Sequence, residues 1–490
     1  MIFSSLQYLL FLPIVVVLFW NTRGAARLWL VVLASYFFYM SWLPVYGILL
    51  LVMTTANWLI ALAMDRSRQK NPSLLKPLLT LGLIGNLGCL CYYKYTNFFL
   101  SNFCSAINWF GAQLHGGSGD IVSWTTMNVM LPLGISFFVF EFVHYLVDIY
   151  RGDKPISSWM EFAAFSAFFP SQIAGPIKRF QDFMPFLRGP LPWSSALFAE
   201  GGALIMQGMF KKVAIADPIG SIVNGCFAPH VVLSSPDAMV ASLGFFIQVY
   251  CDFSGYTDIG RGSALLLGIR LPENFQLPYL SVDLADFWRR WHMSLGLWLR
   301  DYVYIPLGGS RCGQIANSRN LFLTMVACGL WHGAAWHYVI FGCLQGIGLI
   351  VQRQWRDFLR SSASLQSAAK SALGQWAGIA GTALFIIVTF TIFRAPDMPT
   401  GLNVLASWFV GSSGFSLWSP IAKSGVLWFC GIYMLFWLLS EALKKHRQIR
   451  LFDSVPLYPA AIRFASWTAA TFLMIAARPT IATPFVYFQF

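Results

Sequence analysis

Charged side chains are scarce in this chain of 490 residues: they make up 11% of it, whereas 57% of the residues are hydrophobic. The mean hydropathy is +0.61. A water-soluble protein of this length needs far more charged surface, so that class is excluded. The apolar residues also fall in long runs, unlike the short alternating segments of a membrane β-barrel. The sequence therefore predicts an all-α polytopic membrane protein.

Acidic residues are few even among the charges: 20 Asp and Glu stand against 33 Lys and Arg, for a net charge of +13. A basic excess can indicate nucleic-acid binding, but membrane proteins collect Lys and Arg in their cytoplasmic loops. We therefore expect contact with membrane lipid and no nucleic-acid partner. The apolar runs predict roughly 10 to 12 transmembrane helices plus re-entrant and short helices, and the Lys and Arg residues between the runs orient these helices. The charge pattern also predicts that both termini lie outside.

Internal repeats and metal-binding motifs are lacking as well. The nine cysteines are scattered, none has a paired zinc-type spacing, and no HExxH pattern occurs. We predict no metal site and no tightly bound cofactor. The chain is expected to form a single integrated domain over 1–490, with its core motifs in 132–342 and its C-terminal helices and aromatic tail in 376–490.

One apolar run, 320–350, contains the stretch CGLWHGAAWHYVIFG at 328–342. Arg319 precedes the run and Arg353 follows it, so both of its ends are expected on the inside. Its 31 residues are too few for two full spans, which need about 40 residues. The pattern predicts a short helical pair that turns within the membrane near Trp331-His332-Gly333. The segment 156–176 is expected to be re-entrant too, because basic residues place both of its ends inside, and the two prolines of FFPSQIAGP are expected to break its helix.

Ionisable side chains at membrane depth are costly and mark candidate functional sites. His332 adjoins a glycine, which can break the helix and expose the imidazole. A neutral imidazole can accept a proton from a hydroxyl and return it to a thiolate leaving group. The alternative is a histidine that only hydrogen-bonds within a helix bundle. His337, five residues later, points away from His332 on an ideal helix and is expected to be structural.

A second histidine lies among arginines and tryptophans, in FWRRWHMS. Its neighbours Trp288, Arg289 and Arg290 could bind a phosphate-bearing or acidic partner at the inner face. Equally, they could form a rim of snorkelling arginines and interfacial tryptophans around His292.

Two acidic residues, Asp252 and Asp258, lie in YCDFSGYTDIGRG. They could form a catalytic pair. The alternative is that they hold neighbouring helices or arginines in place, and we expect this structural role.

With these residues in view, the chain resembles the membrane-bound O-acyltransferase family, in particular the bacterial branch that contains the alginate O-acetyltransferase membrane subunit and the teichoic-acid D-alanyl transferase. The stretches that carry the resemblance are PLGISFFVFEFVHYLVDIYRG (132–152), FPSQIAGPIKRF (169–180), FKKVAIAD (210–217), the block 250–309 and GLWHGAAWHYVIFG (329–342). Together they cover most of the chain and are highly specific.

The resemblance implies a helical fold around a tunnel across the bilayer. It implies that His332 is the catalytic histidine and that His292 matches the family's second histidine. Trp288, Arg289, Arg290, Trp331 and Asn274 are the candidates for the donor side or the tunnel, Asn274 as scaffold within NFQLPY. The oxyanion donor is either His292 or a backbone N–H.

The C-terminal sequence PFVYFQF is similar to an aromatic ending found in this branch. It suggests that Tyr487 folds back and carries the acyl group, with His332 as base. The alternative is an aromatic anchor at the membrane interface.

The expected function is transfer of an acetyl group from a cytoplasmic thioester, acetyl-CoA or an acyl carrier protein, to an exported polysaccharide such as alginate or cellulose. The resemblance also implies a periplasmic SGNH-type acetyltransferase as a partner, while the oligomeric state stays open. The alternatives are a D-alanyl or other acyl transferase fed by a carrier protein, a transporter with broken helices at the midplane, and a scaffold for a secretion complex.

Overall fold

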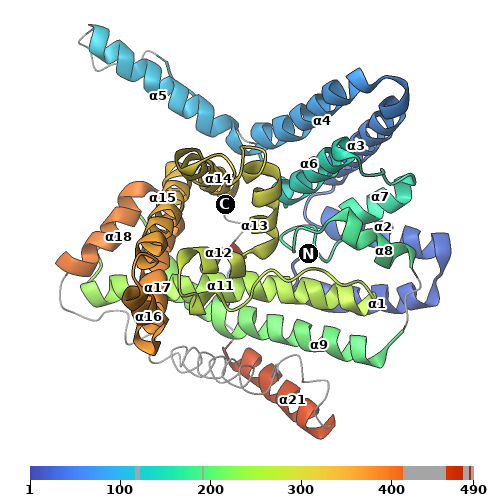
Figure 1. Ribbon diagram of the computed structural model, residues 1–490. Coiled ribbons are helices and arrows are strands. Elements are labelled where there is room, and N and C mark those ends of the chain that lie inside the picture. Colours follow the sequence, from blue (N-terminus) through green and yellow to red (C-terminus); the bar gives the residue numbers. More distant parts are fainter. Residues whose placement is uncertain (116–121, 128, 190–192, 412–459, 478–484, 487–490) are drawn as a thin grey trace.

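The computed structural model describes residues 1–490 except 116–121, 128, 190–192, 412–459, 478–484 and 487–490. The described residues are mostly helical and contain no strand. The predicted all-α class is therefore confirmed (Figure 1).

The helices that precede the central part of the chain are α1 (Leu6–Asn21), α2 (Gly24–Met40), α3 (Val45–Lys70), α4 (Leu75–Leu90), α5 (Thr96–His115), α6 (Ile135–Arg151), α7 (Trp159–Ser166), α8 (Phe180–Arg188), α9 (Ser195–Met209) and α10 (Asp217–Cys226). The later helices are α11 (Ser235–Leu266), α12 (Leu284–Arg290), α13 (Met293–Leu299), α14 (Gln314–His332), α15 (Trp336–Leu359), α16 (Ala363–Lys370), α17 (Ala372–Arg394), α18 (Met398–Val410) and α21 (Ala460–Ala477).

Several helices are long and apolar enough to cross a bilayer, as a multi-pass membrane protein requires. Within the described residues these are Val45–Lys70, Pro72–Leu114, Ser235–Leu266 and Ala372–Arg394, and the shorter apolar helices include α1 and α2. Pro72–Leu114 joins α4, the π-helical turn η2 (Cys91–Tyr95) and α5. In Figure 1, α5 extends away from the rest of the molecule.

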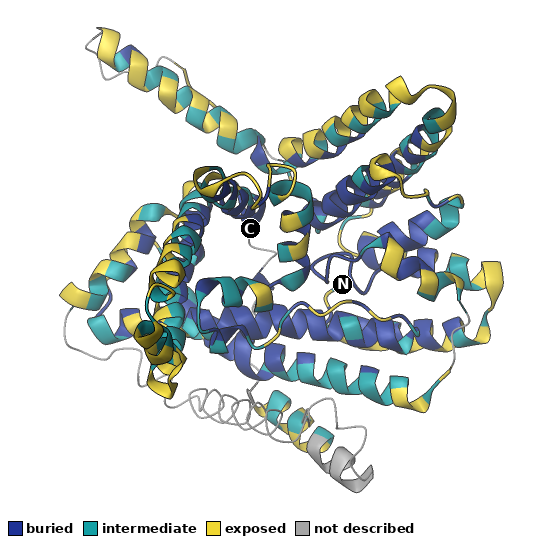
Figure 2. Cartoon of the chain, in the orientation of Figure 1, coloured by how far each residue is buried: buried dark blue, intermediate teal, exposed yellow. Residues whose placement is uncertain are grey.

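Helix α11 forms the centre of the fold, and it packs along α9 (Figure 1). Both helices place glycines at their contact: a Cβ on Gly208 would overlap the carbonyl oxygen of Gly255, and one on Gly262 would overlap that of Gly201. Small residues let helix backbones approach closely. Figure 2 shows that buried residues concentrate on α11 and α6, whereas α5 and α16 carry many exposed ones.

Buried ion pairs connect α11 to the π-helical turn η3 (Phe210–Ala216). The Lys211 ammonium lies 2.6 Å from the Asp258 carboxylate, and the Lys212 ammonium lies 2.7 Å from Asp252 and 2.8 Å from Asp217. Burying such charges is tolerable only when they are paired. The expectation that Asp252 and Asp258 hold neighbouring helices is therefore confirmed, with lysines as their main partners.

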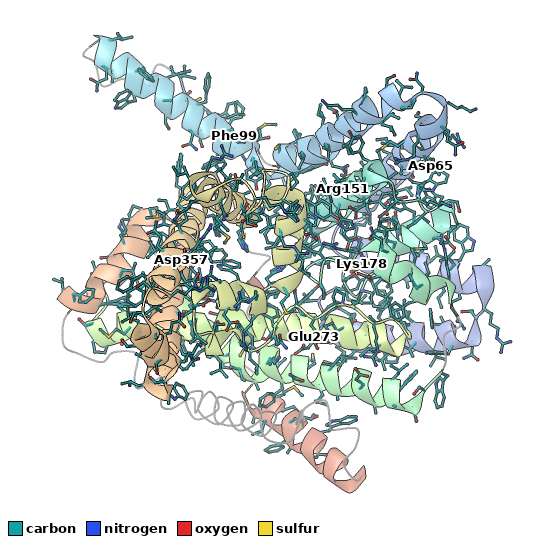
Figure 3. All side chains as sticks on the ribbon, in the orientation of Figure 1. Asp65, Phe99, Arg151, Lys178, Glu273 and Asp357 are labelled. Atoms are coloured by element: carbon teal, nitrogen blue, oxygen red, sulfur yellow. The ribbon has the colours of Figure 1, made fainter. Side chains whose placement is uncertain are left out.

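The segment 156–176 contains only the eight-residue helix α7, followed by a buried irregular stretch at 167–176. Helix α7 ends at Ser166, and the backbone around Pro170 and Pro176 is not helical, in agreement with the predicted break. Irregular backbone of this kind is tolerated in a membrane protein where other protein segments surround it. Lys178, just beyond, is buried in the body of the molecule (Figure 3), where its ammonium lies 2.7 Å from the carboxylate of Glu141 on α6.

The run 320–350 forms the predicted helical pair, with its break at the predicted place. Helix α14 ends at His332 and α15 begins at Trp336. The arms are longer than expected, however, because the helices continue through polar residues to Gln314 and Leu359. At 1.5 Å per residue the arms measure about 28 Å and about 36 Å. Hydropathy marks where apolar side chains stop, but backbone hydrogen bonding carries a helix further.

Candidate active site

The break after His332 depends on a glycine. Gly333 adopts an extended backbone, and a Cβ at this position would overlap the ring of Tyr338 on α15. Further along the pair, Gly329 and Gly342 approach each other so closely that a Cβ on either would overlap backbone of the other arm. These glycines bring α14 and α15 together and fix where His332 emerges.

The C-terminal end of α14 is capped by residues from η2. The last carbonyls of an α-helix have no partner within the helix. Here the Lys94 ammonium donates to the carbonyl oxygens of Trp331 (2.6 Å) and His332 (2.9 Å), and the Tyr95 hydroxyl donates to that of Leu330. Sequence reasoning missed Lys94, although it is the only charged side chain between Pro77 and Leu114.

His332 itself is buried, with 6% of its surface exposed, among aromatic rings. Its ring centroid lies 5.0 Å from Phe393 of α17, 6.2 Å from Phe341 of α15 and 4.9 Å from Trp331. Apolar walls of this kind exclude water and strengthen electrostatic interactions at the imidazole.

Trp331 connects the two histidines that the sequence singled out. Its ring stands edge-on to His292 at 5.8 Å between centroids, and it also packs against Phe137 at 5.3 Å and Phe140 at 5.5 Å, both on α6. The structure therefore brings His332, Trp331 and His292 together, although His292 lies 40 positions earlier in the sequence.

His292 occupies an unusual backbone position directly before α13. Its φ of 44° is in the left-handed region, which costs free energy for a residue other than glycine and often marks a functional site. Its Nδ1 accepts from the backbone N–H of Leu295 at 3.3 Å. In the neutral imidazole the proton then resides on Nε2, which is a hydrogen-bond donor.

Asn274 holds this backbone conformation from the neighbouring loop. Its side-chain oxygen accepts from the backbone N–H of Ser294 at 3.1 Å and from the Ser294 hydroxyl at 2.9 Å. Its carbonyl oxygen accepts from the N–H of Met293 at 2.9 Å. Asn274 is buried, so these bonds are not replaced by water.

The other inner-face candidates lie on α12 and do not join this cluster. Arg289 and Arg290 both pair with Asp286, at 3.3 Å and 3.0 Å, and their side chains are 65% and 32% exposed. The indole N–H of Trp288 donates to the side-chain oxygen of Gln345 on α15 at 3.1 Å. Trp288 therefore links α12 to α15 through this hydrogen bond, whereas the side chains of Arg289 and Arg290 reach solvent.

A cavity of about 130 Å³ opens beside His332. Its lining includes Lys94, Trp331, His332 and the first residues of α6, from Gly134 to Phe137. A small acceptor group could therefore approach the imidazole.

The chain's C-terminal segment approaches the same region. The backbone N–H of Val486 donates to the buried carboxylate of Asp252 at 2.6 Å. The ring of Phe485 stacks on Tyr256 at 4.4 Å and lies 6.1 Å from Phe253, whose ring lies 4.7 Å from His292. Tyr487, the predicted acyl carrier, lies outside the described residues.

No group of three or more His, Cys, Asp or Glu side chains in the described part of the chain could hold a metal ion. The candidate site consists of buried imidazoles in an aromatic setting, at a helix break in a multi-pass helical membrane protein. Imidazoles in such a setting suit proton transfer during acyl transfer.

Comparison with known proteins identifies the class. The model of the membrane-bound O-acyltransferase family matches residues 80–393, and the chain belongs to this family. The break at His332 and the loop at His292 lie within the matched region, and so do the residues that line the cavity beside His332, apart from Trp42.

Three relatives show how far the similarity extends. The probable alginate O-acetylase AlgI of Azotobacter vinelandii is 38% identical over 415 residues, which are 84% of this chain and 78% of that protein. The peptidoglycan O-acetyltransferase of Helicobacter pylori is 35% identical over 421 residues, covering 80% and 75%. The teichoic acid D-alanyltransferase of Bacillus subtilis is 28% identical over 239 residues, covering 45% and 58%. The chain is thus an enzyme of the O-acetyltransferase class, and the transporter and scaffold alternatives are set aside.

Proposed function

We propose that this enzyme transfers an acetyl group from acetyl-CoA at the cytoplasmic face to an acceptor hydroxyl, so that an exported polysaccharide becomes acetylated. His332 acts as the general base. The observation that carries the proposal is the position of His332: it is buried at a helix break, borders a cavity and contacts Trp331, which in turn contacts His292. The names of the two relatives that match most of this chain, an alginate O-acetylase and a peptidoglycan O-acetyltransferase, support an acetyl donor and a polysaccharide acceptor.

The proposed reaction has two steps. The acceptor oxygen attacks the thioester carbonyl while His332 takes the hydroxyl proton, which gives a tetrahedral oxyanion. The C–S bond then breaks, and His332 returns the proton to the CoA thiolate. A positioned donor is needed for the oxyanion. His292 suits this role because its Nδ1 accepts from Leu295, which leaves the proton on Nε2.

Donor binding is assigned to the α12 side of the molecule. Arg289 carries an exposed guanidinium group and Arg290 a half-buried one, guanidinium groups can bind phosphates bidentately, and CoA carries several phosphates. Trp288 would keep α12 docked against α15 while the donor binds.

The acyl relay through Tyr487 is retained as a proposal. Its phenol oxygen would attack the thioester and release the thiol, and the acceptor hydroxyl would then displace the tyrosine from the ester. The docking of Phe485 and Val486 beside Tyr256 and Asp252 supports it, because Phe485 packs against Phe253, whose ring lies 4.7 Å from His292. Loss of polysaccharide acetylation in Tyr487→Phe, with Phe488→Tyr left active, is the expected result, and full acetylation in Tyr487→Phe would remove the relay.

For the acceptor we propose alginate or cellulose, reached through a periplasmic SGNH-type acetyltransferase. We also propose an inner-membrane location with both termini outside. Residues 1–490 are proposed to act as one integrated domain, because a single hydrophobic cluster contains Phe3, Phe142 and Phe485.

A second candidate function is D-alanyl transfer from a carrier protein. The similarity to a teichoic acid D-alanyltransferase favours it, although it covers less than half of this chain. Purified enzyme in proteoliposomes can be offered labelled acetyl-CoA or a D-alanyl carrier protein, and we expect turnover with acetyl-CoA only.

The histidine assignment is tested in the same assay. We expect His332→Ala to abolish transfer at normal protein level, and His337→Ala, a histidine beyond the break, to retain it. Substantial activity in His332→Ala would refute the proposed mechanism.

A further inference from the structure

Lys94 is half-buried and is the one cation that reaches the end of α14 among the described residues, and the reaction scheme above does not use it. It lies in η2, where a π-helical turn interrupts the long unit Pro72–Leu114. Such turns are rare and are frequent at functional sites. From this turn the side chain reaches across to a segment 237 positions away in the sequence.

The contact is made to the last carbonyls of α14 and to no side chain of the site. The ammonium donates to the Trp331 carbonyl at 2.6 Å and to the His332 carbonyl at 2.9 Å. Gly333, which follows, is extended, so the helix is not closed by a further backbone turn. A cation is favourable here because the carbonyl end of a helix carries partial negative charge.

We propose that Lys94 is a positioning residue of the acyl transfer, holding the end of α14 so that the His332 imidazole borders the cavity. This inference rests on the proposed role of His332. Without the ammonium, two buried carbonyls lose their donor, which is costly in an apolar setting. The turn between α14 and α15 would then move, and small displacements of a catalytic group lower the rate strongly.

The neighbouring Tyr95 offers an internal comparison. Its hydroxyl carries no charge and donates to the carbonyl oxygen of Leu330, the residue directly before Trp331. Its loss removes one bond from the same helix end and leaves the carbonyl of His332 capped. The effect of Tyr95→Phe should therefore be smaller than that of removing the Lys94 ammonium.

The test uses full-length enzyme in lipid nanodiscs, with steady-state kinetics on acetyl-CoA and hydrogen–deuterium exchange of the peptide that spans 331–338. For Lys94→Met we expect kcat to fall about 100-fold. The KM for acetyl-CoA should change less than about threefold, because the proposed role of Lys94 is to hold the end of α14 and not to bind the donor. Exchange at 331–338 should become at least about tenfold faster, since amide protection reports local opening. Lys94→Arg, whose guanidinium can also reach two carbonyls, should recover most of kcat.

The controls separate this inference from the proposed function. Lys76→Met, an exposed lysine on α4 of the same helical unit, should behave as the wild type. His332→Ala should be inactive with unchanged exchange at 331–338, and an active His332→Ala would instead refute the base assignment.

If Lys94→Met does not accumulate, Lys94→Gln replaces it. A kcat within about threefold of the wild type, or a lower kcat with unchanged exchange at the turn, would overturn the positioning role.

Discussion

The Trp331 ring stands edge-on to the His292 ring, with 5.8 Å between their centroids, and it precedes His332 in the chain. One side chain thus carries the packing between α14 and the loop before α13. The indole contacts both histidine rings, so a change in the indole should affect both.

Trp331→Ala is expected to lower kcat by more than about 100-fold and to destabilise the fold by about 3–5 kcal/mol, because it removes a buried ring that contacts Phe137, Phe140 and both histidines. Trp331→Phe, which keeps an aromatic ring, should lose much less. Thermal unfolding and acetyl transfer in detergent measure the two effects. The control is Trp355→Ala, an exposed tryptophan on α15. Equal loss in Trp331→Phe and Trp331→Ala would show that packing is not the cause.

Asn274→Ala should impair the site through His292. The substitution removes the acceptor for the backbone N–H and hydroxyl of Ser294, so the left-handed conformation at His292 loses its support. We expect kcat to fall about 10-fold or more, with little change in the KM for acetyl-CoA. Combined with His292→Ala, the two losses should not add, because both act on one group. Asn403→Ala, at an exposed asparagine on α18, provides the comparison. Additive losses would contradict this account.

The fold class, the helix break at His332 and the irregular 167–176 stretch could all be predicted from the sequence. Each is encoded locally: long apolar runs, arginines on both flanks of 320–350, and prolines or a glycine at the interruption. The arm lengths could not be predicted this way, because hydropathy does not register the polar helical ends at Gln314 and Leu359.

The supports of the site could not be predicted, because they depend on contacts between distant segments. Lys94 meets Trp331, and Asp252 meets Val486 across 234 positions. No periodicity within one segment encodes such pairs. The isolation of Lys94 in an apolar run was the available signal, since a charge at membrane depth needs a partner. Sequence alone could flag this residue, whereas its target at the end of α14 required the fold.

Gly333→Ala should disrupt the hairpin turn for a steric reason. The backbone there is extended, which any residue can adopt, but the added methyl would overlap the ring of Tyr338. We expect loss of activity together with lower thermal stability. The double variant Gly333→Ala with Tyr338→Ala should regain stability relative to Gly333→Ala alone, since the overlap is removed. A double variant no more stable than the single one would show that the glycine is needed for another reason.

The buried pair Lys211–Asp258 should matter for stability far more than an exposed pair of similar geometry. Lys211→Met leaves the Asp258 carboxylate buried without this lysine and should destabilise the protein by about 3–5 kcal/mol. Adding Asp258→Leu should restore much of the loss, because no buried charge then stays behind. Arg270→Met breaks the exposed pair with Glu200, at 2.7 Å, and should cost less than about 1 kcal/mol. Thermal unfolding of these three variants and the wild type measures the differences.

The donor side can be tested through the exposed arginines of α12. Arg289→Met is expected to raise the KM for acetyl-CoA about 5- to 20-fold and to leave kcat nearly unchanged, because the guanidinium would bind donor phosphate in ground and transition states alike. The effect should shrink as ionic strength rises, since an exposed charge is screened within a Debye length of about 8 Å at physiological salt. Arg300→Met is the matched control, because Arg300 is a similarly exposed arginine that pairs with Asp301 at 2.7 Å. An unchanged KM in Arg289→Met at low salt would show that Arg289 does not bind the donor phosphates. The arginines of α12 would then belong to a rim at the membrane interface.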